Sequence, residues 1–412
     1  MQKIIKTILK RILALVIFAA VLTASLMSIT YLFRLTEKIP DVLTFFDGNA
    51  VGTEADWERR SGEIKEYFWE NVFGVPPAAP EGQVFVSDGV KYFTEKGITR
   101  ETILYKAGEA FSARFYIYKD SRDLDSPKPF LIHNMHRSQE VNWDIHNSLP
   151  PDNLPDDVSS LPVRKILDAG FNLAVCINGD FAGEGGDVWE TGIFKSLVAE
   201  RERNTIKTIG AWSFGISRLA DYLLAYENVK DGKIGVGGHS RGGKAALLAG
   251  MNDERIGFVW SSCSGCTGAA IARKRPIMGE STWAINFFFP GWFCDNYKNF
   301  NRRESAMELD FHCLAASIAP RLLYISSASK DFHATPKNEL LSAMLASAVY
   351  ENIYGIPGAV VAPSNPKLNE NYHNGNIGYH IKKGGHCQNT EDWARVLEFL
   401  NGKGWGGIKY YL

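Results

Sequence analysis

Residues 233–250 of the chain read KIGVGGHSRGGKAALLAG, and this stretch changes character at one residue. Its first half is a short run of Ile, Val and Gly that predicts a buried strand, and its second half opens an Ala/Leu-rich helix. Between the halves, Gly238 to Gly242 form the pattern G-x-S-x-G. A serine on such a strand-to-helix turn has a strained backbone and an exposed hydroxyl beside the helix N-terminus. We therefore predict that Ser240 is a nucleophile; the alternative is an ordinary serine that caps a helix.

Strands and helices alternate on both sides of this turn. Short apolar runs predict strands at 129–134, 172–177 and 321–328, and amphipathic patterns predict helices after residues 163, 210 and 393. This alternation is typical of a mostly parallel sheet with helices on both faces. An amphipathic helix is also expected from residue 54 to residue 72, and strand-like patterns follow from 83 to 119. We predict one α/β domain over residues 54–412.

A nucleophilic serine needs a base that takes its proton and a carboxylate that orients the base. In the α/β-hydrolase fold the order along the chain is serine, acid, histidine, each on a loop after a strand. His386 lies in the Gly-rich loop KGGHCQNTEDW before the last predicted helix, whereas His380 ends the strand-like GYHI. Asp331 is the first carboxylate after the strand RLLYISSA, and Glu339 lies further on, in a helix-like run. We predict an α/β-hydrolase fold with Ser240, His386 and Asp331 as its triad.

Composition restricts the classes of partner. The chain has 412 residues, of which 45% are hydrophobic and 22% charged, with a formal net charge of −1. These values are those of a folded globular protein. Because the body of the chain carries no basic stripe, we do not expect it to bind nucleic acid.

The first 34 residues form a segment of their own. Lys3, Lys6, Lys10 and Arg11 precede the uncharged run 12–33, whose 22 residues are long enough to cross a bilayer as a helix. Cations before such a run favour an N-terminus in the cytoplasm and a body on the extracytoplasmic side. We expect a transmembrane anchor over residues 1–34 and a linker over 35–53. A cleaved signal peptide, which would give a secreted protein, is the alternative.

The six cysteines do not predict a metal site. Cys263 and Cys266 have the C-x-x-C spacing of redox and zinc sites, but neither a second pair nor a His-x3-His follows. Export would permit disulfides, and six cysteines allow 15 full pairings that spacing does not resolve. We expect no metal and no cofactor.

Five collinear blocks of the sequence resemble the glucuronoyl esterases, carbohydrate esterase family 15. The blocks are GHSRGGKAALLAGMNDERI, SGCTGAAIARKRPIMGES, FPGWFCDNYKNFN, APRLLYISSASKDFHATPKNELL and GYHIKKGGH. The segment DWERRSGEIKEYFWENVFGVPP is similar to the opening helix of that family. The resemblance extends from about residue 57 to the C-terminus.

The resemblance implies roles for individual residues. Ser240 matches the nucleophile of the family and His386 matches its base. The remaining matches surround the substrate: Arg241 at the oxyanion, Lys244 on the uronate sugar, Glu280 on the sugar hydroxyls, and Trp292, in the third block, in the substrate pocket. A cation beside the nucleophile stabilises a tetrahedral oxyanion and also recognises a sugar acid. The ordinary alternative for Arg241 and Lys244 is a pair of helix cations that face solvent.

Two departures from the family pattern matter. Some members carry the catalytic acid after the strand that follows the serine, but WSSCSGC at 260–266 holds no carboxylate, so Asp331 is the expected acid. Many members have a tryptophan two residues beyond that aspartate, where this chain has His333. His333 is therefore a candidate substrate contact that would change the preference for a 4-O-methylated glucuronate; the alternative is that it supports the triad.

These residues predict a serine esterase that acts on carboxylic esters of uronic acids in a carbohydrate, with a second oxyanion donor near Asn134. The alternatives are a deacetylase of acetylated polysaccharide and an anchored binding protein without catalytic activity.

Overall fold

The structure is a computed structural model that describes residues 9, 11–13, 15–23, 25, 36–108, 111–135, 161–185, 188–198, 201–360 and 366–406. Its centre is a ten-stranded sheet with the strand order β1-β2-β3-β5-β4-β6-β7-β8-β10-β9. The strands are β1 (Val84–Phe93), β2 (Ile98–Ala107), β3 (Phe111–Asp120), β4 (Lys128–Met135), β5 (Asn172–Ile177), β6 (Val229–His239), β7 (Ile256–Ser262), β8 (Leu322–Ala328), β9 (Asn371–Tyr372) and β10 (Ile377–Lys382).

The sheet is parallel from β5 to β10 in the strand order and antiparallel at both edges. The parallel strands all end at one edge of the sheet, so the loops after β4, β6, β7, β8 and β10 meet there. The central sheet is thus largely parallel, which confirms the prediction of an α/β architecture.

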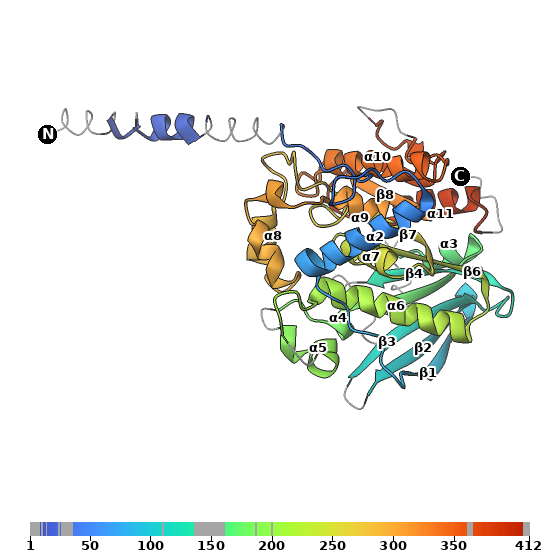
Figure 1. The fold of residues 1–412 in the computed structure, drawn as a ribbon. Coiled ribbons are helices and arrows are strands. Elements are labelled where there is room, and N and C mark those ends of the chain that lie inside the picture. Colours follow the sequence, from blue (N-terminus) through green and yellow to red (C-terminus); the bar gives the residue numbers. More distant parts are fainter. Residues whose placement is uncertain are drawn as a thin grey trace.

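Helices cover both faces of the sheet (Figure 1). They are α2 (Glu54–Phe68), α3 (Val163–Asp168), α4 (Asn178–Phe181), α5 (Gly192–Leu197), α6 (Thr208–Tyr226), α7 (Arg241–Asn252), α8 (Thr282–Phe288), α9 (Phe311–Ala316), α10 (Pro336–Asn352) and α11 (Thr390–Gly402). Neighbours along β4 face opposite ways: Phe130 and Ile132 join the core under α2, α6, α7, α9 and α10, whereas Leu131 joins the core under α3 and α11. Alternate side chains of one strand therefore bury against both helical layers.

The N-terminal segment has two parts. Part of the predicted span 12–33 lies outside the described residues; those described between 9 and 25 are helical and exposed. Among the residues that the structure describes, we find no helix with the length and apolar character needed to span a bilayer. Residues 36–53, suggested above as a linker, pack on the body: Val42 and Phe45 are buried, and His312 Nε2 lies 3.0 Å from the carbonyl oxygen of Pro40.

Candidate active site

Ser240 lies at a sharp turn between β6 and α7, so the predicted strand–turn–helix is confirmed. Its φ is 56° and its ψ is −124°, a conformation that costs free energy for a residue with a side chain. The turn also needs glycine at position 238, because a Cβ there would lie 2.4 Å from the carbonyl carbon and oxygen of Gly242, and a Cβ on Gly242 would lie 3.0 Å from the Asn134 carbonyl oxygen. The serine is thus held at the carboxyl edge of the sheet, immediately before the helix N-terminus.

Asp331 and His386 come together on the loops that follow β8 and β10. His386 Nδ1 donates a hydrogen bond of 2.6 Å to Asp331 Oδ2, and the Ala334 N–H donates to Asp331 Oδ1 at 3.2 Å. Asp331 is buried, which favours the neutral acid, but the bond and charge of His386 outweigh this and lower the pKa of Asp331. An ionised aspartate of this kind holds the imidazole in one tautomer, with Nε2 left to accept a proton.

The two loops are also bonded to each other through their backbones. The Ser329 N–H donates to the Lys382 carbonyl at 2.9 Å, and the Lys330 N–H donates to the Gly384 carbonyl at 2.7 Å. Glu339, the other carboxylate considered, has other partners than His386: it accepts from Ser327 Oγ and from the Gly265 N–H. Strand pairing between β8 and β10 therefore sets the separation of Asp331 and His386.

His386 lies beside the residue that precedes Ser240. The rings of His239 and His386 have centroids 4.5 Å apart. Among the described residues, no hydrogen bond joins Ser240 Oγ to His386; catalytic hydrogen bonds are often long without substrate and shorten in the reacting complex. The structure thus brings the three predicted side chains to one edge of the sheet, with the acid–base bond formed.

Sequence reasoning missed His239, although it stands next to Ser240 in the G-x-S-x-G pattern. Its Nδ1 lies 3.3 Å from Ser262 Oγ. Burial, together with the nearby charges of His386 and Lys382, lowers the pKa of His239 to about 3. The imidazole of His239 is therefore neutral at neutral pH, beside the ring of His386.

Arg241 and Lys244, on the first turns of α7, each have a carboxylate partner. Arg241 Nη1 is 3.0 Å from Glu184 Oε2, and the guanidinium carbon lies 5.5 Å from the centre of the Trp292 ring. Lys244 is buried: its Nζ donates to the carbonyls of Ser264 and Cys266 and lies 3.8 Å from Glu280 Oε2. Neither cation is the solvent-facing residue of the ordinary alternative.

The three remaining predicted contacts lie close to this pair. Trp292 is buried and stacks on Phe289 at a centroid distance of 3.9 Å. The Glu280 N–H donates to the His333 carbonyl at 3.1 Å, and the His333 side chain is exposed. Residues 280 and 333, far apart in the sequence, are thus neighbours at the loop that follows β8.

The predicted second oxyanion donor has a structural partner instead. The Asn134 side-chain amide donates to the Gly242 carbonyl at 2.9 Å, so it ties the end of β4 to α7. The loop that follows β4, over residues 136–160, lies outside the described residues. An oxyanion donor from that loop therefore stays a prediction.

A buried polar network supports the His386 loop from behind. Lys382 Nζ donates to the Cys387 carbonyl and pairs with Asp392, which also accepts from His380 Nε2 at 2.8 Å. Burial raises the pKa of Asp392, but its bonds to His380 and Lys382 outweigh this and lower it. The alternation GYHIK and the helix-capping pattern NTED are the signals from which this network could have been inferred.

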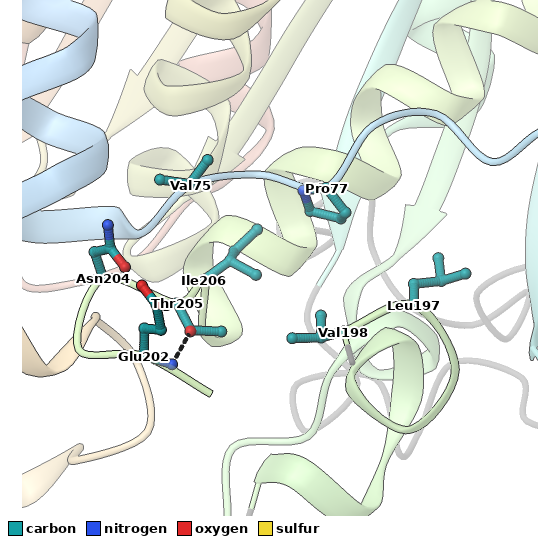
Figure 2. Close-up of a pocket in the computed structure, with 8 residues that line it drawn as sticks. All are labelled: Val75, Pro77, Leu197, Val198, Glu202, Asn204, Thr205 and Ile206. Carbon is teal, nitrogen blue, oxygen red and sulfur yellow. Dashed lines mark hydrogen bonds between the residues drawn. The ribbon is translucent and has the colours of Figure 1, made fainter. Parts of the chain in front are cut away.

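One cavity lies apart from the predicted residues. This cavity, of about 250 Å³, is lined by Val75, Pro77, Leu197, Val198, Glu202, Asn204, Thr205 and Ile206, none of which is a predicted site residue (Figure 2).

The six cysteines, all among the described residues, are free thiols; five are buried and Cys387 is exposed. No disulfide therefore links the described parts of the chain.

Comparison with known proteins agrees with this geometry. The family model "Glucuronyl esterase, fungi" matches residues 167–354. Carbohydrate esterase MZ0003, from an unknown prokaryotic organism, is 29% identical over 402 residues, which is 90% of each chain. The 4-O-methyl-glucuronoyl methylesterase of Podospora anserina is 27% identical over 70% of this chain and 54% of that protein. The solved glucuronoyl esterase from Solibacter usitatus superposes with a TM-score of 0.79 at 30% identity, covering 89% of this chain and 98% of that one.

Proposed function

The chain belongs to the glucuronoyl esterases, carbohydrate esterase family 15, and from this premise we propose that it is a serine esterase that cleaves carboxylic esters of uronic acids in a polysaccharide. The observation that carries the proposal is the 2.6 Å bond between His386 and Asp331, beside the strained turn of Ser240. These elements come from three separate strands, and a structural role does not explain why they converge.

The residues support the following mechanism. Ser240 Oγ attacks the ester carbonyl carbon while His386 Nε2 takes the hydroxyl proton. The oxyanion that forms accepts hydrogen bonds from the N–H of Arg241 and from the start of α7. His386 then gives the proton to the departing alcohol oxygen, and the uronoyl group stays on Ser240 as an ester.

Water completes the cycle by the reverse roles. His386 takes a proton from water, the resulting hydroxide attacks the acyl carbon, and Ser240 leaves as its proton returns. The product is a uronic acid, which ionises at neutral pH. Each step moves only an acyl group and protons, so the reaction requires no cofactor.

The test compares two substrates. We expect release of benzyl alcohol from benzyl glucuronate, a rate that Ser240→Ala lowers by about 10⁴-fold or more. Release of acetate from acetylated xylan with no action on benzyl glucuronate would favour the deacetylase. Equal inactivity of the wild-type protein and Ser240→Ala on both substrates would favour the binding protein.

We further propose that residues 1–34 place the catalytic domain on the extracytoplasmic side of a membrane. The support is the sequence itself: four cations followed by an uncharged run of 22 residues. In an expressing cell, the full chain is expected in the membrane fraction, and an added protease should degrade the domain without lysis. A shortened chain in the medium would instead indicate a cleaved signal peptide.

A further inference from the structure

Each of the two site cations carries its own counter-charge from a different loop. Glu184, which follows α4, pairs with Arg241 at 3.0 Å, and Glu280, which precedes α8, lies 3.8 Å from Lys244. Glu184 has 26% of its side chain exposed and Arg241 21%, so this pair is only partly screened by water. Among the described residues, each of the two cations beside the nucleophile is thus paired with a carboxylate of opposite charge.

This balance matters because the reaction changes the charge of the sugar. The substrate ester is neutral at its carboxyl group, whereas the product is a carboxylate. An unopposed guanidinium beside Ser240 would bind that carboxylate through strong, charge-assisted hydrogen bonds and would retain the product. Discrimination between two ligands is a difference of binding free energies, and it can be achieved by repelling the unwanted one.

Glu184 is placed to supply that repulsion. It holds the guanidinium that lies over the Trp292 ring, and no sequence pattern singled it out. The negative charge of Glu184 repels a second carboxylate that approaches Arg241, whereas it repels a neutral ester oxygen much less. The contact therefore distinguishes substrate from product by charge alone.

We propose that Glu184 is a specificity-determining residue that weakens binding of the anionic uronate product relative to the neutral ester; this rests on the proposed function. Glu184 lowers the affinity of the resting site for the acid that the reaction releases. Turnover is thereby less limited by product inhibition.

The experiment measures binding of a matched pair of ligands. Glucuronate and glucuronamide differ in charge but little in shape, and calorimetry on variants in the Ser240→Ala background reports their Kd values without turnover. We expect Glu184→Gln to tighten glucuronate binding by about tenfold, the size of one lost charge interaction at a partly screened site. Glucuronamide binding should change by less than about twofold.

Two controls separate charge from geometry. Glu184→Asp keeps the charge and should stay within about threefold of the parent for both ligands. Glu63→Gln removes another paired carboxylate, 2.7 Å from Arg60 and with 29% of its side chain exposed, and should leave both Kd values unchanged. An unchanged glucuronate-to-glucuronamide ratio in Glu184→Gln would overturn the inference.

A measurement of benzyl alcohol release from benzyl glucuronate distinguishes failure of this inference from failure of the proposed function. Release of benzyl alcohol by the wild-type protein, with an unaltered binding ratio in Glu184→Gln, contradicts only the role of Glu184. Absence of alcohol release contradicts the proposed esterase itself. With activity present, Glu184→Gln should also show stronger inhibition by added glucuronate, again by about tenfold.

Discussion

Replacing Glu339 by glutamine is expected to stabilise the fold, with a gain that grows as the pH rises from 4.5 to 7, and to remove the part of the pH dependence of stability that Glu339 causes. Glu339 lies on α10 and is completely buried. One carboxylate oxygen accepts from the Gly265 N–H at 3.0 Å and the other from Ser327 Oγ at 2.6 Å. Glutamine can keep both contacts, since its oxygen accepts from Gly265 and its amide can donate to the serine oxygen.

The magnitude follows from the pKa of Glu339. Burial raises it from 4.5 to about 7, although its two hydrogen bonds partly oppose the shift. Below pH 4.5 the Glu339 carboxyl group is protonated in both the folded and the unfolded chain, so it does not lower the free energy of unfolding. As the pH rises from 4.5 to 7 the unfolded chain loses its proton first, and the folded state loses stability. At about 1.4 kcal/mol per unit of pKa difference between the folded and the unfolded chain, the free energy of unfolding at pH 8 is lowered by about 3 kcal/mol.

Urea unfolding at pH 5, 6, 7 and 8 measures this effect. The free energy of unfolding of Glu339→Gln should exceed that of the wild-type protein by about 1 kcal/mol at pH 5 and by about 3 kcal/mol at pH 8. Because the other titrating groups are the same, they cancel in the difference. Glu351→Gln, an exposed change on the same helix, should follow the wild-type profile. Parallel profiles for Glu339→Gln and the wild-type protein from pH 5 to 8 would refute the reasoning.

Three further changes test the site. Gly238→Ala should lower kcat by about 100-fold or more, because the new Cβ would overlap the Gly242 backbone. Gly62→Ala is the control, because a Cβ at position 62 has no atom within 4 Å, and its kcat should not change. A normal kcat in Gly238→Ala would contradict the strained turn. Lys382→Met should lower the free energy of unfolding, measured in urea, by about 3–5 kcal/mol, because Asp392 would stay buried without its cation. The double variant Lys382→Met/Asp392→Asn should recover part of that loss. Additive losses from the two substitutions would contradict an interaction between Lys382 and Asp392. Asp331→Asn should lower kcat by about 10⁴-fold with little change in KM, and more than a tenth of the wild-type rate would exclude Asp331 as the acid.

The local features of the site were predictable because short stretches encode them. A strand, a turn with glycines at both flanks and a helix follow from residues 233–250, since periodicity and steric limits act over a few neighbours. The choice of Asp331 and His386 followed from the rule that functional loops leave the carboxyl ends of parallel strands. The bond between Asp331 and His386 agrees with that choice.

The counter-charges were not predictable in the same way. Glu184 meets Arg241 because β5 and β6 both adjoin β4, which brings the loops after β5 and β6 to one edge of the sheet. Asp392 meets Lys382 because α11 starts directly behind β10. No spacing in the sequence distinguishes these carboxylates from solvated ones.

The sequence by itself determined the succession of strands and helices, the sharp turn at Ser240 and the order of Ser240, Asp331 and His386 on loops that follow strands. Only the tertiary structure decided which loops touch, that Lys244 and Glu339 are buried, and that His239 stays neutral beside His386. The physical reason is the range of the forces involved. Backbone sterics and hydrophobic periodicity act between near neighbours, whereas desolvation and charge pairing depend on what the completed fold places around each group.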